Sequence, residues 1–197
     1  MNNMNEASAR DHSRPGGDAA EERHEGGLAR LANALETLID WLGRVAAWLG
    51  FALVLLVAFN VILRYLFSVG PVSFQEAEWH LVSPIVMIGI AYAMRHGEHV
   101  RVDLFYERFP PRMRHFIDLV VALTTAAIAI IIIYMAVPWV MQSYNIGEGS
   151  PDPGGLPYRF ALKAFVPFGF LLLLIQAAAQ AIKAAIPLFS RSERSHG

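Results

Sequence analysis

The residues best suited to chemistry in this sequence are its seven histidines and the charged run Arg95–Asp103. His96, His99 and His115 lie in or beside that run, and His80 lies within an apolar segment upstream. A transmembrane haem needs axial ligands at matching depth on facing helices. The later apolar segments contain no histidine, so the sequence predicts neither a haem nor a metal site, and no other cofactor.

Other catalytic arrangements are also missing from the sequence. It has no cysteine, which excludes disulfides and thiolate metal sites. It shows no nucleophile constellation, no glycine-rich phosphate loop and no internal repeat of the kind found in secondary transporters. Ionisable residues inside a membrane mark proton and ion paths, but here nearly all lie at the ends of apolar segments. The residues alone therefore predict an accessory or scaffold membrane subunit, not an enzyme or a pump.

The composition predicts an all-α integral membrane protein with four transmembrane helices. Only 17% of the residues are charged and 55% are hydrophobic, whereas a soluble domain has about 25% charged residues. Several uncharged runs approach the roughly 20 residues that cross a bilayer core. The predicted spans are about 45–66, 76–94, 112–144 and 160–183, within a membrane domain 28–189 that is flanked by a disordered cytoplasmic tail, 1–27, and a second cytoplasmic tail, 190–197.

Two shorter helices are predicted to lie at the membrane interface. In residues 28–45, apolar side chains recur at three- and four-residue steps, which indicates an amphipathic helix, with a coiled-coil seam as the alternative. Asp40 and Arg44 on its polar face have i,i+4 spacing. In the central loop, residues 102–109 carry an apolar stripe that predicts a second interfacial helix. Pro111 then fits the first position of the next helix.

The distribution of positive charge predicts the orientation. The stretch Met94–Arg114 lies between two apolar segments and holds five of the sixteen Lys and Arg residues. Short loops this basic lie on the cytoplasmic side. Only Arg64, Arg159 and Lys163 then fall on the outer side, so both termini are predicted to be cytoplasmic.

A few polar residues at the predicted outer ends have two interpretations each. Asn60 and Arg64 share a helix face; Arg64 either extends to water or faces a neighbouring helix or subunit together with Asn60. Ser73 and Glu76 match a capping box, which predicts Ser73 as the N-cap. Glu76 is also placed to meet Arg64 across the short loop, and Glu78 suits the positive end of the helix.

Three motifs carry a resemblance to a known family. They are Asn60–Phe67 (NVILRYLF), Ser73–Glu76 (SFQE), and Gly89–Leu104 (GIAYAMRHGEHVRVDL) before Pro110-Pro111. Together they resemble the small membrane subunit, DctQ-like, of tripartite ATP-independent periplasmic (TRAP) transporters, over about Leu42–Ile186. The G-E-H-x-R-V-D run is the most specific part.

The resemblance implies a four-helix subunit in the bacterial inner membrane that binds a larger Na⁺-coupled membrane subunit. A periplasmic substrate-binding protein would deliver the solute, commonly an organic acid, and dock through loops 65–75 and 145–159. No nucleic acid partner is implied. A membrane-anchor subunit of a redox complex and a free-standing four-helix scaffold are the alternatives.

The site residues predicted on this basis fall into two groups. One is a structured cytoplasmic turn in which Glu98 and Asp103 pair with Arg95, Arg101 or Arg108, the alternative being an ordinary solvated charge run. Its members are Arg95, Gly97, Glu98, His99, Arg101 and Asp103. The other group holds candidate contacts with the large subunit, and its members are Asn60, Arg64 and Glu76.

Overall fold

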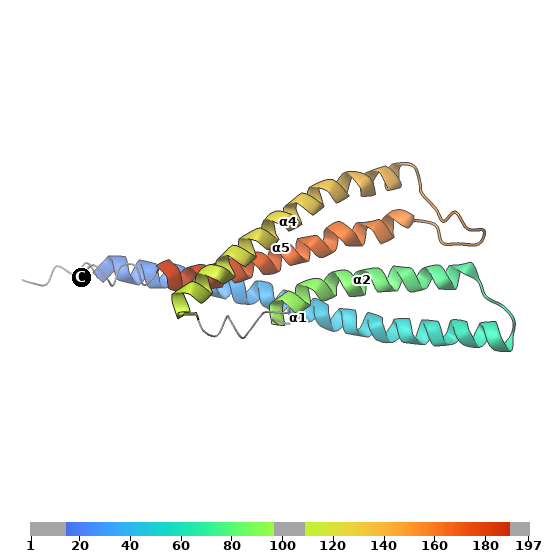
Figure 1. Cartoon of the computed structure of the whole chain (residues 1–197), viewed down its shortest axis with the longest axis horizontal. Helices are drawn as coiled ribbons and strands as arrows, with labels where there is room; N and C mark the ends of the chain where they lie inside the picture. The colour runs from blue at the N-terminus through green and yellow to red at the C-terminus, as the bar shows by residue number, and fades with distance from the viewer. Residues whose placement is uncertain (1–14, 97–108, 190–197) are drawn as a thin grey trace, which may run out of the picture.

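The computed structural model describes residues 15–96 and 109–189, which form four long α-helices (Figure 1). They are α1 (Pro15–Leu66), α2 (Val72–His96), α4 (Pro111–Asn145) and α5 (Arg159–Phe189). All four are long and apolar enough to cross a membrane. The prediction of an all-α protein with four transmembrane helices is therefore confirmed for the described residues.

The helices form two hairpins, α1–α2 and α4–α5, that meet through α5 (Figure 1). α5 contacts the three other helices, whereas α4 packs mainly against α5. Buried alanines at positions 122, 129 and 136 of α4 let the two helices approach closely. We call the end where α2 stops and α4 starts the inner end, and the end with loops 67–71 and 146–158 the outer end.

The buried core lies in the inner half of the bundle. Its larger cluster comes from three helices: Ile39 and Ala46 of α1, Ile88 and Ala91 of α2, and Leu172 of α5. A second, smaller cluster joins α2 to α5 and consists of Met94, Leu173 and Ala177. Because lipid is as apolar as these side chains, the helices associate here through close packing.

The first helix differs from the sequence prediction. α1 runs without interruption from Pro15 to Leu66, so residues 28–45 are continuous with the first span instead of forming a separate helix. It also begins inside the range predicted as a disordered tail. The interfacial position of 28–45 stays a prediction. The interfacial helix predicted at residues 102–109 lies outside the described residues, apart from its last residue, Phe109.

The helix starts bear out one prediction and correct another. Pro110 is the N-cap of α4, and Pro111 occupies the first helical position as predicted. Ser73 is not the N-cap of α2, because the helix already begins at Val72. The amide of Phe74 donates to the carbonyl of Pro71 at 3.1 Å, so the first turn starts before Ser73 and contains it.

Candidate functional site

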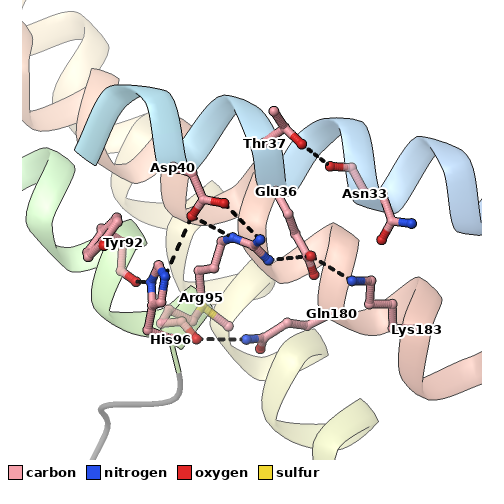
Figure 2. Close-up of polar contacts among 10 residues, drawn as sticks. Asn33, Glu36, Thr37, Asp40, Tyr92, Arg95, His96, Gln180 and Lys183 are labelled. Atoms are coloured by element: carbon pink, nitrogen blue, oxygen red, sulfur yellow. Dashed lines mark hydrogen bonds and ion pairs between the residues drawn. The ribbon is translucent and has the colours of Figure 1, made fainter. Parts of the chain in front are cut away.

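Five charged or ionisable side chains from three helices meet at the inner end, and we call them the inner cluster. They are Glu36, Asp40, Arg95, His96 and Lys183, shown in Figure 2. Arg95 donates from Nε and Nη2 to the two oxygens of Asp40, at 2.7 and 2.8 Å. Its Nη1 donates to Glu36 Oε2, and Lys183 Nζ donates to the same oxygen at 2.6 Å. The cluster thus joins α1 to both α2 and α5.

Glu36 depends most on its partners. Its side chain is only 9% exposed, and its oxygen receives hydrogen bonds from two cations. A carboxylate taken out of water is strongly unfavourable unless it is paired and hydrogen-bonded, and removing one partner of a buried pair costs about 3–5 kcal/mol. Because the buried carboxylate of Glu36 needs its partners, it holds α1 against α2, which carries Arg95, and against α5, which carries Lys183.

A packed aromatic ring supports the same end of the bundle. The rings of Tyr92 and His96 lie 4.2 Å apart between centroids, and His96 Nε2 lies 3.7 Å from Asp40 Oδ1. Tyr92 packs directly over Gly43 of α1, where an added Cβ would lie 2.6 Å from its Cε2 atom. Gly43 thus gives the ring room beside α1, and the ring in turn packs against His96.

Gln180 of α5 adds a hydrogen bond between helices. Its Nε2 donates to the carbonyl of Met94 at 2.9 Å (Figure 2). This carbonyl belongs to the last turn of α2, where carbonyls lack a partner within the helix. The bond therefore satisfies a helix end and holds α2 against α5.

The outer end carries a second polar group, which we call the outer cluster: Glu76, Glu148, Ser150, Leu156 and Lys163. Glu76 of α2 accepts hydrogen bonds from the Ser150 hydroxyl and the Leu156 amide, both in the loop between α4 and α5. Gly155 is needed for this approach, because an added Cβ would lie 2.8 Å from Glu76 Oε2. The loop therefore folds around the carboxylate of another helix.

The rest of the outer cluster lies within the α4–α5 hairpin. Lys163 Nζ donates to Glu148 Oε2 at 2.5 Å and lies 4.5 Å from the centre of the Trp139 ring. Gly147, with φ of 61°, gives the chain the left-handed turn that often follows a helix. The hydrogen bond from Lys163 lowers the pKa of the Glu148 carboxyl below its usual range.

Asn60 and Glu78 form a separate contact between α1 and α2. Asn60 Nδ2 donates to Glu78 Oε1 at 2.9 Å, and Asn60 is the one buried residue of α1 beyond Ala46. Phe59 and Phe74 stack edge to face beside it, 5.8 Å apart. This end of the first hairpin is closed by its own side chains.

Two comparisons with known proteins identify the chain. The family described as "Tripartite ATP-independent periplasmic transporters, DctQ component" matches residues 53–186. The chain belongs to the DctQ family. It is also 32% identical over 170 residues to the ectoine TRAP transporter small permease protein TeaB of Halomonas elongata, covering 84% of this chain and 86% of TeaB. The resemblance seen in the sequence is confirmed: this is a multi-pass small permease component of a tripartite transporter, and not an enzyme.

The DctQ match includes part of the inner cluster and all of the outer cluster. Arg95 and Lys183 of the inner cluster lie within residues 53–186, whereas their carboxylate partners Glu36 and Asp40 precede the matched region. All five residues of the outer cluster lie within it. The partners of Arg95 therefore come from a part of α1 that carried none of the motifs.

The structure places the predicted loop motif in part. Arg95 pairs with Glu36 and Asp40 of α1, where the sequence suggested a partner within the loop. Asp40 likewise takes Arg95, not Arg44, as its hydrogen-bond partner. The other predicted residues of the turn, Gly97, Glu98, His99, Arg101 and Asp103, lie outside the described residues, as does Arg108.

The three predicted contacts with the large subunit are separated by the structure. Asn60 turns inward to Glu78, and Glu76 turns to the outer loop instead of meeting Arg64. Arg64 is exposed at the end of α1. Of the three, Arg64 is exposed, Glu76 is partly exposed and Asn60 is buried, and their contact with the large subunit stays a prediction.

Sequence reasoning missed several residues because their pattern resembled a solvated helix face. Glu36 and Asp40, four apart, are two carboxylates on one side of α1, and Lys183 ends an apolar run. The sequence did offer one signal. It has two carboxylates at i,i+4 spacing before the first span and an arginine directly after the second span, and such groups can pair if the two helices are neighbours. Gln176, 1% exposed on the same face of α5 as Gln180, gave no signal of its burial.

Proposed function

We propose that this chain holds the large Na⁺-coupled subunit of a TRAP transporter in the bacterial inner membrane, with both termini in the cytoplasm. The large subunit would carry the solute, and a periplasmic binding protein would deliver it. Membership of the DctQ family supports the presence of both partners. The division of labour between them rests on the distribution of polar side chains.

That distribution is the observation that carries the proposal. In the described residues, the paired charges gather at the inner and outer ends of the bundle. Between them the helices bury alanine, leucine and isoleucine, with the amide of Gln176 as a buried polar exception nearer the inner end. A solute or ion path needs a continuous series of polar groups. Such a series does not connect the two clusters in the described helices.

The solute class is proposed from relatives, since the described helices contain no continuous polar path for a solute. The family resemblance favours an organic acid, and the relative TeaB is named for ectoine. We assign the choice between these solutes to the binding protein and the large subunit. Exchanging this chain for TeaB in an assembled transporter should then leave the solute preference unchanged.

Reconstitution in liposomes tests the scaffold role. The chain alone, the large subunit alone, and the two together would each be supplied with binding protein, labelled solute and a Na⁺ gradient. We expect uptake only when both membrane subunits are present. Na⁺-driven uptake by this chain alone would contradict the proposal, and so would full activity of the large subunit without it.

The proposed orientation has a direct test, because the chain contains no cysteine. Single cysteines at Asn33 and at Gly149, both exposed, lie at the inner and outer ends. In intact cells, a membrane-impermeant maleimide should label Gly149→Cys and should label Asn33→Cys only after the inner membrane is opened. The reverse pattern would overturn the orientation.

A further inference from the structure

The two halves of the bundle are held together by different means. In the inner half, α1, α2 and α5 share one core and the inner cluster. In the outer half, α1 buries only Asn60 beyond Ala46, and that side chain contacts its own hairpin partner α2. The inner half thus joins three helices, whereas in the outer half α1 is held to its own hairpin partner.

Each hairpin is closed internally at its outer end. In α1–α2 the contacts are Asn60 with Glu78 and Phe59 with Phe74. In α4–α5 they are the Glu148–Lys163 ion pair and the Tyr144–Phe160 ring contact, 5.1 Å between centroids. Each of these four contacts lies within one hairpin. They therefore do not set the distance between the two hairpins at the outer end.

Glu76 provides the contact that does cross. It stands in the first turns of α2, and both of its carboxylate oxygens are bound by the loop of the other hairpin, through the Ser150 hydroxyl and the Leu156 amide. The loop is ordered around it: the Ser150 amide donates to the Leu156 carbonyl at 3.2 Å, and the Asp152 amide to the Ser150 hydroxyl at 3.1 Å. Gly155 admits the carboxylate.

A close approach between the hairpins lies well inside the bundle. Gly169 of α5 packs on Met87 of α2, where an added Cβ would lie 2.5 Å from the Met87 Cβ. Met87 is eleven residues beyond Glu76, which is about 16 Å along a helix at 1.5 Å per residue. The first three turns of α2 and of α5 therefore extend outward beyond this contact.

We propose that Glu76 and the loop 146–158 form a latch that sets the separation of the two hairpins at the outer face. With the latch closed, the loop bridges the hairpins and presents one fixed conformation. With it open, the outer ends separate about the Gly169–Met87 contact while the inner core and inner cluster stay in place. This role goes beyond the proposed scaffold function, because it assigns a movable outer half to an otherwise fixed subunit.

Spin labels provide the test, because the cysteine-free chain accepts labels without background. One pair, Leu66→Cys with Met141→Cys, reports on the outer ends of α1 and α4; a second pair, Leu38→Cys with Met113→Cys, reports on the inner end. All four positions are exposed. Distances would be measured by double electron–electron resonance on the full chain in lipid nanodiscs.

The latch predicts a change at one end only. Glu76→Ala should broaden the outer-pair distribution and add a component longer by about 2 Å or more, the scale of a loop or domain rearrangement. The inner-pair distribution should not change. Ser150→Ala, which removes only a hydroxyl on a loop, should give a smaller change in the same direction.

Glu78→Ala is the matched control, since Glu78 is also a carboxylate in the first turns of α2 but contacts Asn60 within its own hairpin. It should leave the separation of the hairpins as in the parent chain. The proposal is overturned if Glu76→Ala leaves the outer pair unchanged, if both pairs change equally, or if Glu78→Ala has the same effect as Glu76→Ala. These distances are measured without partners, so they do not depend on the proposed transport role.

Discussion

The inner and outer ends of this DctQ chain use the same kinds of side chain in different ways. At the inner end, one arginine and one lysine join carboxylates from a distant part of the sequence, and three helices are held by a connected set of ion pairs. At the outer end, the ion pair lies within one hairpin, and the hairpins meet through hydrogen bonds to a single carboxylate. The comparison indicates that the inner end is a fixed junction of three helices. The outer end is a contact between two hairpins that can open.

The largest effect is expected from Arg95, which holds the inner end together. Arg95→Ala removes the partner that Glu36 and Asp40 share, but Glu36 keeps Lys183 and Asp40 is 34% exposed. We therefore expect a loss of about 1.5–3 kcal/mol of stability, the range for a hydrogen bond to a charged group. Thermal unfolding in detergent, followed by circular dichroism, would measure it.

Arg112→Ala is the control, because Arg112 is an exposed arginine near the same end. Arg95→Lys should fall between the two, since lysine keeps the charge but loses the two-pronged contact with Asp40. Equal unfolding temperatures for Arg95→Ala and Arg112→Ala would show that the inner cluster does not hold the helices.

Gly169 lies where the fixed inner half of the bundle meets the movable outer half. Gly169→Val places a side chain against Met87, and overpacking of this kind costs about 1–3 kcal/mol. Gly89→Val is the matched control on α2, since an added Cβ there meets nothing within 4 Å. If both variants unfolded at the same temperature, the close approach of α2 and α5 would be irrelevant to stability.

A smaller effect is expected from Asn60, which closes the first hairpin. Asn60→Leu removes the donor to Glu78, and losing one hydrogen bond costs about 1 kcal/mol. The outer-pair distances between hairpins should not change, because the contact lies within α1–α2. A change in the outer-pair distances in this variant would show that the Asn60–Glu78 contact also sets the separation of the hairpins, which contradicts the comparison.

The smallest effect is a pH dependence at the outer end. The pKa of Glu148 is held below its usual range by the hydrogen bond from Lys163. A carboxyl whose folded pKa is lowered stabilises the fold above its unfolded pKa, and this contribution is lost as the pH falls through the folded pKa. Acidification below the usual carboxyl range should therefore lower the unfolding temperature less in Lys163→Met than in the parent chain. An identical acid response of the two proteins would contradict this.

The sequence was sufficient for the four helices because hydropathy and charge are local signals. Long uncharged runs, the basic central stretch and Pro111 all act within a few residues of their own position. The inner cluster was not predictable in this way, since Asp40 and Arg95 are 55 positions apart and Glu36 and Lys183 are 147 apart. Pairing them requires knowing which helices are neighbours.

The contacts of the outer loop were also not predictable from the sequence. The family resemblance placed loop 145–159 at the outer face, and Glu76 was recognised as a residue of interest. What the pattern lacked was the path of the loop, which brings the Ser150 hydroxyl and the Leu156 amide to the carboxylate. The sequence analysis chose Arg64 as the partner of Glu76 because it is close in the sequence, and this prediction was wrong.

The unbroken length of α1 has a mechanical consequence. Its 52 residues make a rod about 78 Å long at 1.5 Å per residue, whereas a bilayer with its headgroups is about 40–45 Å thick. Part of the rod therefore either leans steeply or stands clear of the lipid on the side of the inner cluster. A force applied to that end would be transmitted along one continuous helix, past the inner cluster, to the outer end of the bundle.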